Sequence, residues 1–159
     1  MARNASRSDL KIERGTVLAI PLSVGGWAMS QVLHPGLSFY LAVFSERFTD
    51  LRETAVASAS KPRLCSWTND AEVYRGRWKN LGVVDVTTED PGIPEYQCIV
   101  GGQECVVRYD GKVLRPFVSH RDGDLQLKSS RSPLLIEDAA NALMGEGRWL
   151  PLYDRMLIP

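Results

Sequence analysis

The chain opens with three apolar runs that turn residues separate, and this pattern limits its possible folds more than any other feature. The runs are Thr16 to Leu22, Trp27 to Leu33 and Leu37 to Phe44. Val24-Gly25-Gly26 can supply the positive φ of a tight hairpin. His34-Pro35-Gly36 breaks the chain, because proline lacks an N–H donor and glycine permits a reversal. The second run alternates between two faces with the period of a β-strand. We therefore expect a meander of three antiparallel strands.

A second meander is expected further along the chain. Its strands are predicted at Tyr96 to Val100, Glu104 to Tyr109 and Lys112 to Phe117, joined by Gly101-Gly102 and by Asp110-Gly111. An Asp-Gly pair between alternating apolar runs is among the strongest short-range hairpin signals. The length of 159 residues fits one domain with a sizeable core. The sequence thus predicts a single α+β domain, built mainly from a twisted antiparallel β-sheet with one or two short helices.

The segment between the two meanders carries weaker signals. A short helix can run from Thr49 or Asp50 to Ala59. Arg63 to Thr68 alternates like a strand, Asn69 to Gly76 is a polar link, and Trp78 to Val86 is expected to return as another strand. The two strands would extend the predicted sheet.

The C-terminal part predicts one well-defined helix, at about residues 133–144. Ser132 can cap its N-terminus, and Pro133 suits the first helical position. Its expected apolar face holds Leu135, Ala139, Ala142 and Leu143. The tail from Trp149 to Ile158 is unusually apolar for a terminus, so we expect it to dock on the body of the protein or on a partner, including a second copy in a homodimer. We divide the chain into a flexible tail and lead-in (residues 1–14), a β-rich core (15–117) and a C-terminal extension (118–159).

The sharpest charge asymmetry lies in the loop between the meanders. Between positions 85 and 95 the chain has four carboxylates and no basic residue; the carboxylates are Asp85, Glu89, Asp90 and Glu95. Prolines stiffen this loop, so presenting its carboxylates costs little entropy, and Trp78 and Tyr96 stand beside it in the sequence. Such a surface suits a basic protein partner, whose approach electrostatic steering accelerates. An ordinary solvated loop has the same composition, so the residues alone leave both interpretations open.

The overall charge excludes a general preference for polyanions. Nineteen basic and nineteen acidic residues cancel, which gives no bias toward nucleic acid or anionic membranes. No apolar run has the length of a membrane span, and the N-terminus lacks the apolar region of a signal peptide. Cys65, Cys98 and Cys105 are odd in number and too widely spread for a zinc site, although Cys98 and Cys105 can face each other across a hairpin. We expect free thiols in the cytoplasm.

No signature of a reaction is present in the sequence. His34 and His120 have no nucleophile or orienting partner close by, and the residues from Ser119 to Asp124 have the composition of a solvated loop. Glycine-rich nucleotide motifs and a nucleophile elbow are absent. We therefore predict no enzymatic activity, no metal and no cofactor, and keep a small hydrolase that uses His120 as a third hypothesis.

A local basic stretch gives the second hypothesis. From Arg108 to Arg131 the chain has six basic residues against three aspartates. A small nucleic-acid-binding β-domain would use such charges together with aromatic rings that stack on bases. The candidate residues of this face are Arg108, Tyr109, Arg115, Phe117 and Arg121. An exposed sheet face would alternate charges in the same way.

Two blocks of sequence also resemble a known family. In the first, Gly15 leads into an aliphatic run that ends in Ile-Pro-Leu, and a turn, a Gln-Val-Leu strand and an aromatic-aliphatic strand follow. In the second, Gly76 to Gly82 reads GRWKNLG and is followed by Pro91, Pro94 and Tyr96. Together they resemble the immunity protein 26 family of bacterial polymorphic-toxin systems, over roughly Lys11 to Tyr109.

The resemblance implies a protein that binds a cognate toxin domain inside the cell and blocks its active site or substrate surface. A protein of this kind needs a rigid recognition face and no catalytic residues. Many such toxins are nucleases with basic clefts, for which Glu89, Asp90 and Glu95 would mimic phosphates. We therefore expect the partner contact at Trp78, Tyr96 and the four carboxylates of the acidic loop. The extension after Phe117 lies outside the resemblance.

Overall fold

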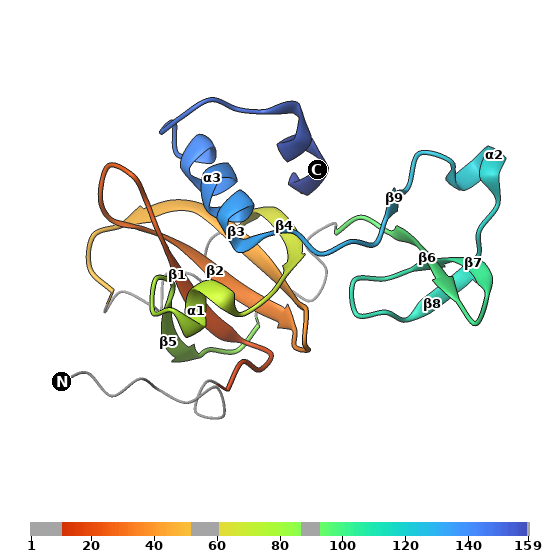
Figure 1. The fold of residues 1–159 in the computed structure, drawn as a ribbon, viewed down its shortest axis with the longest axis horizontal. Coiled ribbons are helices and arrows are strands. Elements are labelled where there is room, and N and C mark those ends of the chain that lie inside the picture. Colours follow the sequence, from red (N-terminus) through yellow and green to blue (C-terminus); the bar gives the residue numbers. More distant parts are fainter. Residues whose placement is uncertain (1–10, 52–60, 87–92, 159) are drawn as a thin grey trace.

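Two β-sheets organise the fold (Figure 1). The structure is a computed structural model that describes residues 11–51, 61–86 and 93–158. The first sheet has the strand order β4-β3-β2-β1-β5, and the second has the order β8-β7-β6-β9. The strands of the first sheet are β1 (Thr16–Pro21), β2 (Trp27–His34), β3 (Phe39–Phe48), β4 (Pro62–Thr68) and β5 (Lys79–Val83). Those of the second sheet are β6 (Tyr96–Val100), β7 (Gln103–Val107), β8 (Val113–Pro116) and β9 (Gln126–Leu127).

Helical segments are short apart from one near the C-terminus. They are α1 (Ala71–Tyr74), α2 (Ser119–Asp122), α3 (Pro133–Leu143) and the 3₁₀ helix η3 (Pro151–Met156). Figure 1 shows α3 and η3 on the same side of the first sheet, with the second sheet beside them. The predicted α+β class, with mainly antiparallel sheets in a single domain, is confirmed.

The opening meander forms as predicted. β1 runs antiparallel to β2, with Val17 opposite Gln31, and β2 runs antiparallel to β3. The turn between β1 and β2 uses glycine at positive φ, because Gly25 has φ 96° and Gly26 has φ 79°. Those angles are strained for residues with a side chain. The hairpin turn therefore lies at the residues where the sequence predicted it.

β5 completes the first sheet at its other edge. It pairs antiparallel with β1, with Leu18 opposite Asn80. The strand is shorter than the predicted Trp78 to Val86, because Trp78 still belongs to the turn after α1. In this turn the backbone N–H of Trp78 donates to the Glu72 carbonyl at 3.0 Å. The helix α1 itself lies in the segment that we expected to be a polar link. Asn69 Oδ1 accepts the Ala71 N–H at 3.0 Å and starts this helical turn.

Both faces of the first sheet are buried. One face packs against α1, α3 and η3; its side chains include Leu18, Ile20, Phe39, Leu41 and Leu64. The opposite face supplies Tyr40, Cys65 and Trp67 to a cluster shared with the second sheet. This is why the six central residues of β2 are all buried, whichever of the two faces their side chains lie on.

The second meander also forms as predicted, from β6, β7 and β8. Aromatic rings join it to the first sheet. Trp67 lies 4.4 Å from Tyr96 in an edge-on arrangement, and Tyr40 stacks on Tyr109 at 5.1 Å between ring centroids. The extension adds β9 in parallel to β6, a pairing that the sequence analysis did not predict. The extension thus contributes to both parts of the fold.

The predicted C-terminal helix is confirmed as α3, but its buried face differs from the prediction. Ile136, Ala139 and Ala140 are at most 1% exposed, whereas Leu135, Ala142 and Leu143 are only partly buried. The face is rotated because the helix packs against Trp78 and η3 as well as the sheet. Ser132 occupies the N-cap position but makes no side-chain capping hydrogen bond.

The apolar tail docks on the body of the protein, one of the two outcomes that we expected. Tyr153, Met156 and Ile158 are buried. The Ile158 N–H donates to the Arg63 carbonyl at 2.9 Å, and Leu157 forms a β-bridge with Leu64 on the edge of β4. These contacts are made within one chain, and the homodimer through this tail stays a prediction.

Two predicted features fall outside the described residues: most of the helix from Thr49 to Ala59, and the carboxylates of Glu89 and Asp90. Of Lys11 to Arg14, the described part of the lead-in, Ile12 packs partly buried against the core. None of the helices in the described ranges has the length and apolar character that a bilayer crossing requires.

Candidate functional site

The two aromatic residues predicted at the partner contact lie in the interior. Trp78 is 1% exposed and Tyr96 is 4% exposed. The indole N–H of Trp78 donates to Glu137 Oε2 at 3.3 Å, and the hydroxyls of Tyr96 and Tyr40 are 2.8 Å apart. Their proximity to the acidic loop in the sequence was therefore misleading. Both rings support the fold and are removed from any surface that a partner can reach.

The predicted carboxylates have different environments. Asp85 is exposed just after β5. Glu95 is partly buried, and its Oε2 lies 2.6 Å from the guanidinium of Arg115 in β8. Glu89 and Asp90 belong to residues 87–92, outside the described ranges. Of the four predicted carboxylates, two lie in the described ranges. Asp85 is open to a partner, whereas Glu95 already pairs with an arginine of its own chain.

A second carboxylate shares Arg115. Asp122, at the end of α2, is 3% exposed and accepts hydrogen bonds from Arg121, from the Val118 N–H and from Arg115 at 2.9–3.0 Å. Arg121, the Val118 N–H and Arg115 together hold the pKa of Asp122 well below its usual range. The loop after β8 is thereby tied to the second sheet.

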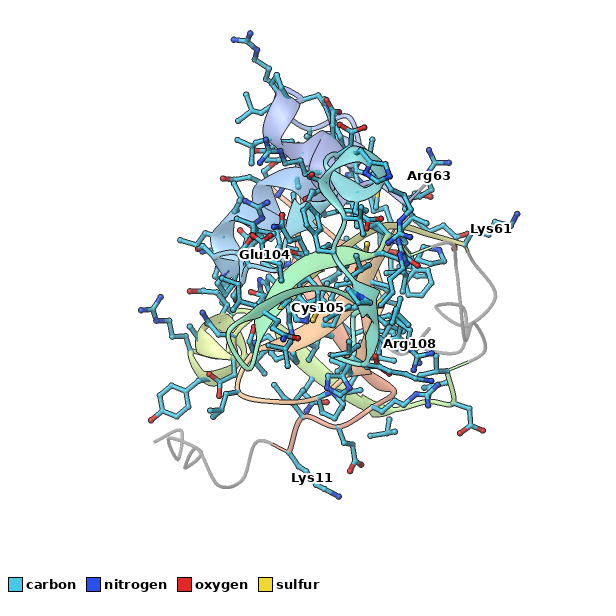
Figure 2. The ribbon with its side chains drawn as sticks, turned by 90° about the vertical axis from the view of Figure 1, so that its right-hand side faces the viewer. Lys11, Lys61, Arg63, Glu104, Cys105 and Arg108 are labelled. Carbon is cyan, nitrogen blue, oxygen red and sulfur yellow. The ribbon has the colours of Figure 1, made fainter. Side chains whose placement is uncertain are left out.

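This pairing affects the proposed nucleic-acid face. Arg115 and Arg121 are engaged by Asp122, and Arg108 pairs with Asp110 and lies 5.6 Å above the Tyr109 ring. The Arg108 side chain lowers the pKa of Asp110 to about 2. In Figure 2 Arg108 lies beside the second sheet, near the strand that carries Cys105. The carboxylates of this face thus largely neutralise its positive charges, which leaves little positive charge to bind phosphates.

The remaining sequence candidates do not converge. His120 is exposed in α2, and His34 ends β2 on another part of the fold. Cys98 and Cys105 lie directly opposite each other in β6 and β7, and all three cysteines are free thiols. Burial raises the pKa of the Cys65 thiol, which keeps it protonated. Among the described residues, no group of three His, Cys, Asp or Glu side chains is placed to hold a metal ion.

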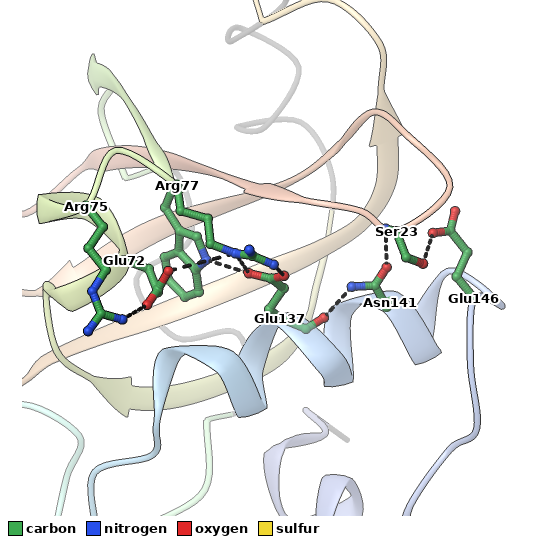
Figure 3. A network of polar contacts seen from close by, with 8 residues as sticks. Ser23, Glu72, Arg75, Arg77, Glu137, Asn141 and Glu146 are labelled. Atoms are coloured by element: carbon green, nitrogen blue, oxygen red, sulfur yellow. Dashed lines mark hydrogen bonds and ion pairs between the residues drawn. The ribbon is translucent and has the colours of Figure 1, made fainter. Parts of the chain in front are cut away.

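A polar network on α3, which the sequence analysis missed, is better organised (Figure 3). Arg77, in the turn after α1, forms a bidentate ion pair with Glu137, which is 7% exposed. Glu72 lies on the other side of Arg77 and pairs with Arg75 at 2.7 Å. The Glu137 carboxylate raises the pKa of Arg77 by hydrogen bonding and by its charge. The arginine therefore links α1 to α3.

The network continues along α3 to the turn between β1 and β2. Asn141 donates to the Glu137 carbonyl at 2.9 Å and accepts the Ser23 N–H at 2.7 Å. Glu146 accepts the Ser23 hydroxyl and the Val24 N–H, both at 2.9 Å, and pairs with Arg47. A signal was available, because Glu137 and Asn141 stand four positions apart beside Ile136 and Ala140 on the buried face of α3.

A cavity of about 350 Å³ opens beside this network. Its lining residues are Pro21, Leu22, Ser23, Arg77, Glu137, Asp138, Asn141, Glu146, Gly147, Arg148 and Tyr153. The volume lies at the lower end of the range of small-molecule sites, roughly 300–1,000 Å³. The arrangement can bind a polar molecule. The Ser23 hydroxyl donates to Glu146, but Arg47 stabilises the charged form of this carboxylate and makes it a poor general base.

Comparisons of the chain with models of protein families, with curated proteins and with solved structures found no match. They assign the chain to no family. The resemblance to immunity protein 26 therefore rests on the two sequence blocks alone.

Proposed function

We propose that the chain is an immunity protein, which binds a bacterial toxin domain and neutralises it by covering its active site. The observation that carries the proposal is the adjacency of the two sequence blocks of the resemblance. The second block enters β5, where Asn80 lies opposite Leu18 of β1 in the first block. The Val84 N–H donates to the Gly15 carbonyl at 3.0 Å, and Gln31 Nε2 donates to the Val84 carbonyl at 2.9 Å. Segments far apart in the sequence thus form one structural unit.

The internal pairing of charges favours binding over catalysis. The buried carboxylates in the described ranges, Glu72, Asp122 and Glu137, each have an arginine of the same chain as a partner. A carboxylate held in this way is a poor general base, because the arginine stabilises its charged form. The pair of Glu137 with Arg77 and the pair of Asp122 with Arg115 also join separate elements, which makes the framework more rigid and lowers the entropic cost of binding a partner.

The acidic loop is the proposed contact. Asp85 is exposed where the chain leaves the first sheet, and Glu89 and Asp90 follow it in the sequence. A basic cleft of a nuclease toxin would attract these carboxylates, which would occupy the positions of phosphates. The proposed site of action is the cytoplasm.

Charge reversal tests the contact. The variant Asp85→Lys/Glu89→Lys/Asp90→Lys is expected to lose protection and co-purification with the toxin domain. Glu95 is left unchanged, because reversing it would also break its pair with Arg115. The matched control reverses three exposed carboxylates elsewhere, Glu46, Glu104 and Asp124, and should retain both properties. If the loop variant protects as well as the control variant does, the acidic loop is not part of the contact with the toxin.

The alternative, a small nucleic-acid-binding β-domain, receives less support from the arrangement of charges. Arg108, Arg115 and Arg121 all pair with aspartates of the same chain. Retention on heparin that weakens steeply with salt would favour this alternative over the immunity function.

A further inference from the structure

The cavity beside α3 has walls that its own hydrogen bonds hold in place. Arg77 is fixed by Glu137, and Asn141 is fixed between the Ser23 N–H and the Glu137 carbonyl. Glu146 is held by Arg47 and by the turn between β1 and β2. Because these groups are already paired, they give the cavity its shape and do not need a ligand for their own charges.

Three other groups at the cavity have no such partner. Asp138 and Arg148 are exposed, and neither forms an ion pair or side-chain hydrogen bond within the described residues. Tyr153 is 3% exposed, and its ring packs edge-on against Trp149 at 5.4 Å. Its hydroxyl makes no hydrogen bond to a described residue, although the residue lines the cavity. The hydroxyl is not one of the fully buried unpaired atoms, so solvent in the cavity reaches it.

The three unpaired groups offer complementary chemistry. Arg148 supplies a cation that suits a carboxylate, and Asp138 supplies an anion that suits an ammonium group. The pKa of Tyr153 is raised by burial and by the Asp138 charge, so its hydroxyl keeps its proton and can donate or accept. Asp138 would repel a ligand that carries only a negative charge, and Arg148 would repel one that carries only a positive charge. The site favours a molecule that carries both.

We propose that this cavity binds a small zwitterion of the free α-amino acid class, with its carboxylate on Arg148, its ammonium group on Asp138 and the Tyr153 hydroxyl as a third contact. The volume of about 350 Å³ admits such a molecule with its side chain. The proposal does not depend on toxin binding, because it uses neither the acidic loop nor the second sheet. Failure of one proposal therefore leaves the other standing.

Isothermal titration calorimetry of the full chain against each of the twenty L-amino acids tests the site. We expect saturable binding of at least one of them with a dissociation constant of about 1 mM or below. The corresponding amine without the carboxylate, and the corresponding acid without the ammonium group, should each bind at least about tenfold more weakly. Failure of all twenty to bind at 10 mM would overturn the proposal, and so would equal binding of a singly charged analogue.

Substitutions locate the binding. Arg148→Ala and Asp138→Asn should each weaken it at least about tenfold, and Tyr153→Phe should weaken it while keeping the ring packing. Both charged residues are exposed, so these variants should remain folded, which a thermal melt checks. Arg63→Ala and Asp124→Asn make comparable changes outside the cavity and should bind normally. Unchanged binding by Arg148→Ala and Asp138→Asn would place the amino acid elsewhere and overturn the assignment.

Discussion

Trp78 donates its indole N–H to Glu137 at 3.3 Å, across 59 positions of sequence. Trp78 belongs to the second block of the family resemblance, and Glu137 belongs to the extension that lies outside it. The contact is buried and is reinforced by the ion pair of Glu137 with Arg77. The extension is therefore a structural part of the body that carries the resemblance.

Glu137→Ala should destabilise the protein, because it leaves the buried Trp78 N–H without an acceptor. The expected cost is about 1–3 kcal/mol for the unpaired donor alone. Glu137→Gln keeps an oxygen acceptor and should cost less. Urea denaturation measures the difference, with the exposed neighbour Asp138→Ala as a control that should stay within about 0.5 kcal/mol of the wild type. A Glu137→Ala variant as stable as this control would show that the contact contributes little.

Gly15→Ala should be more damaging than Gly25→Ala, although both positions have positive φ. A Cβ at Gly15 would overlap the Val84 carbonyl oxygen, whereas a Cβ at Gly25 would meet no atom within 4 Å. We expect about 1–2 kcal/mol for the backbone strain at Gly25 and a larger loss at Gly15. Thermal or urea unfolding of the two variants gives the comparison. Equal losses would mean that the backbone at Gly15 relaxes away from β5.

Acid should weaken the part of the fold that depends on Asp122. Its pKa is lowered in the folded state, so its contribution to stability is present above the unfolded pKa of about 3.9 and is lost as the pH falls towards the folded value. Asp122→Asn should therefore be less stable than the wild type at pH 7, and the difference should shrink at pH 3. Urea midpoints at both pH values measure it. The exposed Asp124→Asn should show neither effect, and a difference for Asp122→Asn that grew at pH 3 would contradict the account.

Mild oxidation should link Cys98 to Cys105, because the two residues are direct partners in the β6–β7 ladder. Hydrogen peroxide would oxidise the two thiols to one disulfide and would be reduced to two molecules of water. Mass spectrometry should show the loss of two hydrogens and a peptide cross-link. Cys65→Ser should still form the link, because Cys65 is buried in β4, where it pairs with Ala42 of β3 and not with either of the other cysteines. Cys98→Ser and Cys105→Ser should not; a cross-link to Cys65 would contradict the register.

The strands could be predicted because their signals are local. Gly25-Gly26 and Asp110-Gly111 mark turns between apolar runs, and such turns specify which neighbours pair. Ser132-Pro133 marks the start of α3 in the same way. The buried face of that helix could not be read so easily, because Ile136 and Leu135 are equally apolar and only the packing against Trp78 decides between them.

The site could be predicted less well, because burial depends on contacts that are distant in the sequence. Trp78 and Tyr96 stand next to charged residues, yet Glu137 and Tyr40 hold them in the interior. The strand β9 has two residues and pairs in parallel with β6, which leaves no periodic signal. The pair of Glu137 with Arg77 could not be predicted from the neighbours of either residue, because 60 positions separate the two.

Co-expression with the domain encoded directly upstream of the gene, which the proposed function predicts to be toxic, tests the central claim most directly. The toxic domain alone should arrest growth, and this chain should restore growth and co-purify with that domain as a stable complex. A chain that is produced in folded form, yet neither restores growth nor co-purifies with that domain, would contradict the immunity function.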